Sequence, residues 1–298
     1  APTPGQSNIQ RTSTVVTASG VKESGILPPG SALANSLSSV VPGAPISLQL
    51  TSEESKNMSF GFVFNSLRST ASIDFYQLKV TDRISLSPFV NTTSADFSAP
   101  EQASINEVIA ELVSQGVPGA STINSFQFFI NDFDTVTKGV DFTLEVPIDL
   151  FEKNNTTFSF IYNHTVTKVD TNQDNLIDSS RISLLESALP DNRWIITGLH
   201  ESQNWYVLAR ISYFDAITII SDANSSFDGN YGAKTIFDID GAYNFDNGVV
   251  LQFGVENLFN VKPDKYPDPA SFSGQVYPDE SPFGFHGTYY YLAFKYGF

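Results

Sequence analysis

The chain has 298 residues, of which 41% are hydrophobic and 13% aromatic, and it contains no cysteine. Its formal net charge of −16 argues against a nucleic-acid partner, because phosphate backbones bind basic surfaces. The lack of cysteine excludes disulfides and thiolate metal sites and fits an oxidising compartment. No apolar run reaches the roughly eighteen residues of a transmembrane helix, whereas membrane strands carry their signal in alternation.

The segment from Ala1 to Ser55 is rich in Ser, Thr, Pro and Gly and has little periodicity, so we predict a loop. It contains no initiator Met, no basic region and no apolar leader, so no signal peptide is visible. For an exported protein this leaves two alternatives: a leader has been removed, or the sequence is an excerpt of a longer chain.

Strand candidates follow, each alternating apolar and polar side chains with the period of two that strands require. In the long insertion 88–121 we expect a helix, with apolar positions 105, 108, 109, 112 and 113 and an end at Gly116. We also expect a bulge near Lys138-Gly139 and a hairpin turn at Asn247-Gly248. The predicted strands are 58–67, 71–87, 126–148, 157–169, 193–200, 205–214, 235–245, 249–259 and a closing strand within 285–298.

The closing segment is the most informative one. Its alternate side chains are all apolar or aromatic up to the last residue: Tyr290, Leu292, Phe294, Tyr296 and Phe298. Soluble proteins rarely finish on such a strand, whereas outer-membrane barrels do, because their sealing strand presents aromatic side chains to lipid and to the membrane interface. The segment therefore predicts a membrane barrel.

The connections between the predicted strands are alternately long and short, which is typical of outer-membrane barrels with long outer loops and short periplasmic turns. A soluble β-sandwich would share the alternation of side chains, so the loop asymmetry favours the barrel. In a barrel, the charged side chains that alternate with apolar ones face a polar lumen. We predict this position for Arg210, Asp238, Asp240 and Glu256.

Five motifs, in order over residues 52–298, resemble the TonB-dependent receptors. They are the Glu54–Asn57 lead into a strand, Asp82-Arg83-Ile84, the strand Phe128–Asp141, the run Gly254-Val-Glu-Asn-Leu-Phe-Asn260, and Ser281–Gly287 before the closing strand. The resemblance implies an all-β, transmembrane antiparallel β-barrel, of which about nine C-terminal strands of 22 are present. Residues 1–55 would be an extracellular loop region, and 56–298 the C-terminal part of the barrel.

The same resemblance implies the bacterial outer membrane as location and uptake of a scarce nutrient as function, of the ferric siderophore, cobalamin or oligosaccharide class. An open nine-stranded sheet would expose unpaired backbone groups to lipid, so we expect a larger receptor whose N-terminal plug is missing from this chain. Expected partners are outer-membrane lipid, the barrel assembly machinery, which would read the closing strand as its signal, the TonB complex through the plug, and a small-molecule nutrient. The resemblance implies no enzymatic activity and no cofactor, and it assigns no substrate-binding residue.

Two alternatives stay open on the sequence: an outer-membrane porin or translocator that does not use TonB, and a soluble secreted β-sandwich that binds a ligand. Residues 170–178 have the acidic spacing of a calcium loop, yet Asn175 replaces the turn glycine and Arg181 the bidentate glutamate, so we interpret them as a solvated loop. His164, His200 and His286 lie on different predicted segments and predict no metal site. We find no catalytic constellation.

Overall fold

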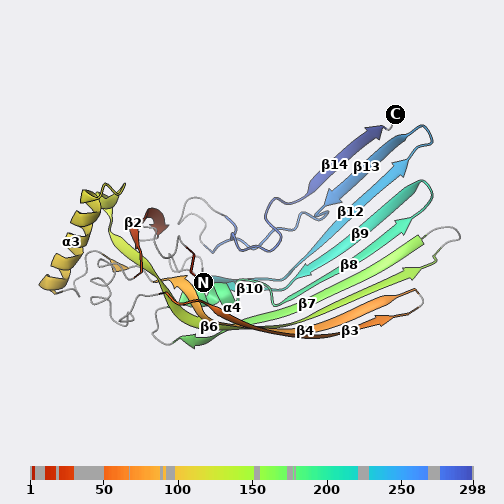
Figure 1. The fold of residues 1–298 in the computed structure, drawn as a ribbon. Coiled ribbons are helices and arrows are strands. Elements are labelled where there is room, and N and C mark those ends of the chain that lie inside the picture. Colours follow the sequence, from red (N-terminus) through yellow and green to blue (C-terminus); the bar gives the residue numbers. More distant parts are fainter. Residues whose placement is uncertain are drawn as a thin grey trace.

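The computed structural model describes residues 2–3, 11–17, 20–29, 50–66, 68–87, 90–91, 98–150, 155–172, 177, 179–220, 228–267 and 276–296. Most of them belong to one large curved sheet, which forms a trough in Figure 1. Within the described residues, no helix is long and apolar enough to cross a membrane.

Nine long strands follow one another through this sheet, and each is antiparallel to its neighbours. All nine strands predicted from the alternation are present, which confirms the period-two interpretation. Their bounds are β3 Glu54–Asn65, β4 Thr70–Leu86, β6 Ser125–Ile148, β7 Asn155–Asn172, β8 Asn192–Glu201, β9 Trp205–Phe214, β12 Lys234–Asn244, β13 Val249–Glu256 and β14 Tyr289–Tyr296.

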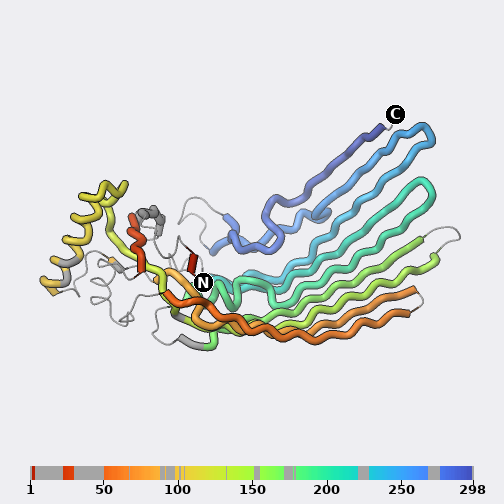
Figure 2. The backbone as a smooth tube through the Cα atoms, viewed as in Figure 1, coloured from red at the N-terminus to blue at the C-terminus, as the bar shows by residue number. Residues whose placement is uncertain are grey.

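Short connections lie at one end of the sheet and long connections at the other, as the tube in Figure 2 shows. We call these the turn end and the loop end. At the turn end, Gly248 has a φ of 82°, which the predicted Asn-Gly hairpin requires. A bidentate ion pair between Arg68 and Asp149 joins two neighbouring turns.

The predicted bulge at Lys138-Gly139 is wrong, because both residues pair in unbroken register with β4 and β7. The irregularities lie nearer the loop end, around Arg83 on β4 and between Asp134 and Thr135 on β6. Gly139 serves another purpose. The Tyr76 ring crosses it so closely that a Cβ there would lie 2.2 Å from Tyr76 Cζ. A strand glycine can mark such a close approach as well as a bulge.

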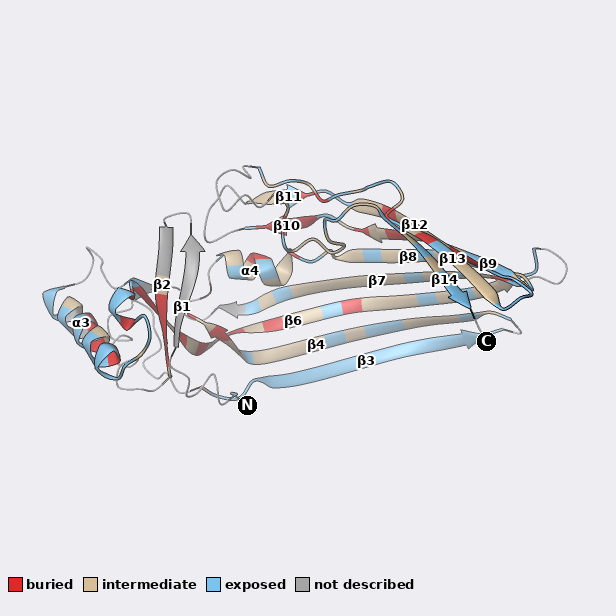
Figure 3. Ribbon diagram, turned by 90° about the horizontal axis from the view of Figure 1, so that it is seen from above, coloured by how far each residue is buried: buried red, intermediate tan, exposed pale blue. Residues whose placement is uncertain are grey.

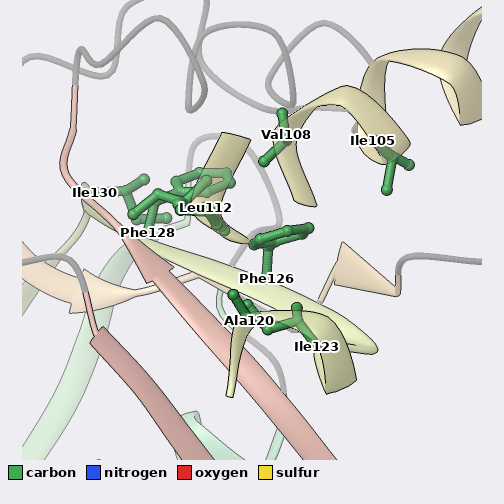
Figure 4. Close-up of a cluster of buried hydrophobic side chains, with 9 residues drawn as sticks. Ile105, Val108, Leu112, Ala120, Ile123, Phe126, Phe128 and Ile130 are labelled. Atoms are coloured by element: carbon green, nitrogen blue, oxygen red, sulfur yellow. The ribbon is translucent and has the colours of Figure 1, made fainter. Parts of the chain in front are cut away.

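A small hydrophobic core lies at the loop end, beyond the long sheet. Helix α3 (Ala99–Ser114) packs on the first part of β6, as Figure 4 shows. The helix ends as predicted, with Gly116 at a φ of 72° and Val117 N–H donating to the Leu112 carbonyl. The core consists of Leu27, Ile105, Val108, Leu112, Ala120, Ile123, Phe126, Phe128 and Ile130.

The segment predicted as a loop before residue 55 contains a hairpin, β1 (Arg11–Thr17) and β2 (Gly20–Leu27). Strand β2 lies parallel to the first residues of β6 and supplies Leu27 to the core. The reason for the miss is that a Ser- and Thr-rich hairpin has no apolar face of its own, so alternation does not reveal it. A two-residue strand β5 (Val90–Asn91) and a 3-10 turn η1 (Ala120–Thr122) complete this region.

Two further long connections contain small elements. Helix α4 (Ser179–Glu186) follows β7, and the hairpin of β10 (Ile217–Ile219) and β11 (Gly229–Tyr231) follows β9. Helix α4 and strand β10 are held together by two hydrogen bonds: the Ser183 and Ser187 hydroxyls both donate to the Thr218 carbonyl, at 3.1 and 3.0 Å. Residues 173–176 and 178 of the calcium-like segment lie outside the described residues.

The sheet has two chemically different faces. Because directly paired residues share a face, the strand register assigns each side chain to one of them. What we call the apolar face carries Phe60, Phe62, Phe64, Phe158, Ile196, Trp205, Val207, Tyr243, Phe253, Leu292 and Phe294, all exposed. What we call the polar face carries Asp74, Asp141, Asn163, Thr197, Arg210, Asp238, Asp240 and Gln252. Figure 3 shows the exposed strands β3 and β14 at the two edges.

Candidate lumen-facing site

A cavity of about 820 Å³ lies on the polar face, between strands β9, β12, β13 and β14 and the long connection that precedes β14. The strands line it with both apolar and charged side chains, Leu208 and Phe214 beside Arg210 and Asp238. Phe283 and His286 of the connection also line it. Such a mixture of apolar walls and a few converging polar groups is typical of a ligand site.

All four residues predicted to line a lumen lie at this cavity. Arg210 and Asp238 are direct partners across β9 and β12, and Asp240 lies one step further along the same face. Glu256 ends the neighbouring strand β13. Among the described residues, Arg210 forms no ion pair, so its guanidinium remains available in the cavity.

Asp240 is the centre of a hydrogen-bond network that joins four adjacent strands. Its Oδ1 accepts from the Tyr206 hydroxyl of β9 at 2.6 Å, and its Oδ2 accepts from the Tyr291 hydroxyl of β14. The Gln252 amide of β13 donates to the same Oδ2 at 3.3 Å and to the Tyr206 hydroxyl at 3.4 Å. Hydrogen bonds to a charged carboxylate are stronger than neutral ones, so the network fixes the floor of the cavity.

A glycine makes the Tyr291 contact possible. Gly254 is the direct partner of Tyr291, and a Cβ at that position would lie 2.2 Å from Tyr291 Cζ. The ring therefore lies flat across β13 and reaches Asp240 on the strand beyond. Tyr76 lies over Gly139 in the same way and bonds the Thr165 hydroxyl at 2.5 Å.

The Asn-Leu-Phe-Asn run of residues 257–260, which directly follows β13, connects the last long connection to the strands that line the cavity. Asn257 is buried with a φ of 52°, its N–H donates to Asp238 Oδ1 at 2.8 Å, and its side chain bonds Val261 in both directions. Its carbonyl accepts from the Thr288 hydroxyl at 2.8 Å, at the entry to β14. Asparagine tolerates this left-handed backbone better than most residues. The run thus sets where the last long connection leaves and re-enters the sheet.

The predicted assembly-signal residues lie on the opposite face from the cavity. Tyr290, Leu292, Phe294 and Tyr296 are 69%, 73%, 68% and 53% exposed. Phe298 lies outside the described residues. Tyr289 and Tyr291, which alternate with these residues along β14, lie on the other face and line the cavity.

Carboxylates of the connections at the loop end are held by specific donors. Asp264 accepts hydrogen bonds from the Lys234 ammonium at 2.6 Å and from the Gly232 N–H at 2.7 Å, and these bonds lower the pKa of its carboxyl. The Asn192 amide, at 2.6 Å, and the Ala216 N–H lower the pKa of Asp215. Burial, assisted by the charge of Glu280, raises the pKa of Tyr266 to about 12. These connections therefore keep their charges fixed at neutral pH.

The described residues contain no group of three or more His, Asp or Glu side chains that could hold a metal ion. His164 pairs with Asn192 Oδ1 at 2.9 Å on β8, and His200 with the Thr156 hydroxyl at 2.7 Å on β7. His286 lines the cavity on the polar face. The three histidines are thus far apart in the fold, in three different settings.

The sequence of residues 11–258 matches the family described as "TonB dependent receptor-like, beta-barrel". The chain belongs to the TonB-dependent receptor β-barrel family.

Solved structures share this fold. The ferric enterobactin receptor PfeA of Pseudomonas aeruginosa (R480A_Q482A mutant) is 12% identical and has a TM-score of 0.58, with 99% of this chain and 36% of that chain covered. The outer membrane transporter YddB of Escherichia coli is 9% identical with a TM-score of 0.56, and 93% and 35% are covered. The FrpB iron transporter of Neisseria meningitidis (F5-1 variant) is 13% identical with a TM-score of 0.51, and 83% and 32% are covered. The chain spans about a third of the length of these receptors. No curated protein sequence matches it.

Membership in the TonB-dependent receptor family confirms the predicted family, fold class and outer-membrane location. The soluble β-sandwich is wrong, because the nine strands form one sheet that exposes its aromatic face. The other alternative, a porin or translocator that does not use TonB, is also wrong, because the chain belongs to the TonB-dependent receptor family. The family is a receptor family and not a class of enzymes.

Sequence reasoning missed Tyr206, Gln252, Tyr291 and Asn257 as residues that build the site. The alternation already placed Tyr206 on the same face as Arg210, and Gln252 opposite the apolar positions of β13. Alternation does not give the register between strands, and it is this register that brings Tyr206, Gln252 and Tyr291 to Asp240.

Proposed function

We propose that this chain forms part of the barrel wall and several outer loops of a receptor that takes up a scarce nutrient with energy from the TonB complex. The family match over residues 11–258 carries the proposal. The two-faced sheet supports it, since a membrane wall needs an apolar face toward lipid and a polar face toward the passage. The TonB complex would act through a plug domain that binds inside the barrel.

In this proposal Arg210, Asp238, Asp240 and Glu256 face the lumen. Their shared cavity supports the assignment, because a lipid-facing carboxylate or guanidinium would be strongly destabilising. Asp238 and Asp240 are engaged by the wall itself, through the Asn257 N–H and the two tyrosines. Arg210 and Glu256 are the charged groups left to meet a solute.

The proposed solute is a bulky nutrient of the ferric siderophore, cobalamin or oligosaccharide class. Ferric siderophores are the first class to test, since the receptor PfeA that shares the fold is named for one. Arg210 offers a planar, multi-donor group suited to carboxylate or catecholate oxygens, whereas Glu256 offers an acceptor suited to hydroxyl groups.

The test is uptake of labelled ferric siderophores, cobalamin and oligosaccharides by cells that produce the complete receptor, with and without a functional TonB complex. We expect TonB-dependent uptake of one class, and a reduction of roughly tenfold in Arg210→Gln at limiting solute, about the loss of one charge-assisted hydrogen bond. The matched control is Lys295→Gln, which removes the same charge from β14 at the turn end.

Uptake that proceeds equally without TonB, or no uptake of any class, would contradict the proposed function. Equal uptake by wild type, Arg210→Gln and Lys295→Gln would leave the receptor intact but contradict the role of Arg210. Surface display of each variant, measured with protease-accessible loops on whole cells, separates these results from failed assembly.

A further inference from the structure

The basic side chains of the apolar face gather in one place. Lys56 of β3, Lys79 of β4 and Lys168 of β7 lie in one row across the sheet, with Val136 of β6 between the last two. Lys138 lies in the next row, between Gln77 and Val166. We call these four residues the lysine patch. On β8, β9, β12, β13 and β14, the described residues place no Lys or Arg on this face.

The lysine patch lies at the loop end, just beyond the apolar belt. Toward the turn end, the rows that follow contain Phe60 with Phe75, and then Phe62 with Phe142. On β7, Lys168 lies farther toward the loop end than Tyr162, which belongs with Trp194 and Tyr213 to a band of aromatic side chains on the same face. Amphipathic rings of this kind mark the level of the lipid headgroups.

Three of the four ammonium groups are available to a ligand. Lys56, Lys138 and Lys168 are exposed and, among the described residues, form no ion pair. Lys79 is held by Asp170 at 3.1 Å and Asp134 at 3.6 Å, on the loopward margin of the patch. Since neighbouring strands are about 4.8 Å apart, the patch is roughly 15 Å across from β3 to β7.

An open hollow of about 570 Å³ lies where the patch meets the belt. Lys138 and Gln77 border it on the polar side, and Met58, Phe60 and Phe75 on the apolar side. His164 also lines it. The hollow therefore offers one cation, a hydrogen-bonding amide and an apolar wall for hydrocarbon within one site.

We propose that the lysine patch binds the headgroup of a phosphorylated glycolipid in the outer leaflet of the outer membrane. The phosphates pair with Lys56, Lys138 and Lys168, the sugar hydroxyls meet Gln77, and an acyl chain lies against Met58, Phe60 and Phe75. Charge complementarity carries the assignment, because a chain with net charge −16 concentrates its lipid-facing cations at the level of anionic headgroups. Several phosphates on one headgroup match a patch of this width better than a single phosphodiester does.

The test measures binding of fluorescent diphosphoryl lipid A, and separately of phosphatidylglycerol, to the complete receptor extracted from outer membranes into detergent. The triple variant Lys56→Gln/Lys138→Gln/Lys168→Gln keeps the side-chain stems and removes three charges. We expect its dissociation constant for lipid A to rise by roughly tenfold or more, since each lysine near an anionic surface contributes on the order of a fivefold factor. Added salt should weaken wild-type binding more than that of the variant.

The matched control, Lys262→Gln/Lys265→Gln/Lys295→Gln, removes three exposed lysines away from the patch and should bind lipid A as wild type does. The corresponding three Lys→Arg changes in the patch should also retain binding, which shows that charge and not side-chain identity is read. Equal binding by the patch variant and the control would overturn the proposal. If the wild type bound phosphatidylglycerol as tightly as lipid A, the assignment to a glycolipid would be overturned, and the patch would have only a general attraction to anionic lipid.

Discussion

Asp240 shows how a single carboxylate on the polar face organises the wall of this receptor. It receives hydroxyl groups from β9 and β14, two strands that are not neighbours, and an amide from β13. A carboxylate can accept several such bonds at once, so one residue cross-links four strands. Gly254 is as necessary as the donors, because any side chain there would push the Tyr291 ring away.

Tyr291→Phe should lower the free energy of unfolding by about 1–2 kcal/mol, because it removes one hydrogen bond to a carboxylate but keeps the ring over Gly254. The matched control is Tyr289→Phe on the same face of β14, where the hydroxyl makes no hydrogen bond among the described residues; it should change stability by less than about 0.5 kcal/mol. Urea unfolding of the receptor in lipid vesicles measures both. Equal effects of the two changes would contradict the role assigned to the Tyr291 hydroxyl.

At the scale of elements, the last long connection is held to the sheet at separate points. Asn257 and Thr288 fasten its two ends, and Asp264, in its first third, accepts hydrogen bonds from Lys234 and from the Gly232 N–H. Phe283, His286 and Gly287 of the connection line the cavity, so these contacts hold one of its borders in place. The Asp264 contact depends on pH, because the hydrogen bond from Lys234 lowers the pKa of its carboxyl.

The lowered pKa of Asp264 means that its contacts stabilise the connection above the ordinary aspartate pKa of about 4 and are lost as the pH falls through the lowered value. Asp264→Asn should therefore increase hydrogen exchange at Gly232 at neutral pH, and the difference from wild type should vanish in acid. Mass-spectrometric exchange at matched pH values measures this. Asp246→Asn, in the turn at the other end of the sheet, should leave Gly232 unchanged at every pH; a difference from wild type that persists in acid would contradict the linkage.

At the scale of the whole molecule, the apolar face has the vertical order of a membrane wall. Trp194 stacks on Tyr213 at a ring-centroid distance of 5.2 Å near the loop end, and Trp205 lies 5.1 Å from His200 near the turn end. Between them the same face of β9 carries Val207, Ala209 and Ile211. The two tryptophans of the chain thus bracket the belt.

In lipid vesicles, depth-dependent bromolipid quenchers should place both tryptophans at the interfaces and neither at the bilayer centre. The fluorescence lost on Trp194→Phe or on Trp205→Phe isolates each contribution. As a reference, Ala209→Trp on the same face of β9 should be quenched most strongly by bromines near the bilayer centre. If Trp194 or Trp205 matched Ala209→Trp in depth, the proposed belt would be misplaced along the strands.

Much of this fold follows from local chemistry. Alternation from Met58 to Phe64, or from Trp205 to Tyr213, needs no knowledge of the rest of the chain, because each strand must present one face to lipid. The Asn-Gly turn and the apolar stripe of α3 are equally local. The turn is present as predicted, and four of the five predicted apolar positions of the helix pack on the core, whereas Val113 is exposed. The hairpin β1–β2 was not predicted, because it pairs with residues of β6 that lie more than a hundred positions away in the sequence.

Alternation along each strand was enough to show which of its side chains share a face, and it selected Arg210, Asp238, Asp240 and Glu256 as one group. The folded sheet was needed to show that Tyr206, Gln252 and Tyr291 meet at Asp240. It was also needed to show that Gly139 accommodates a tyrosine ring rather than a bulge, and that four distant lysines form one patch. The physical reason is that the period of a strand is intrinsic to its own backbone. The register between strands instead depends on packing, turns and hydrogen bonds contributed by several segments at once.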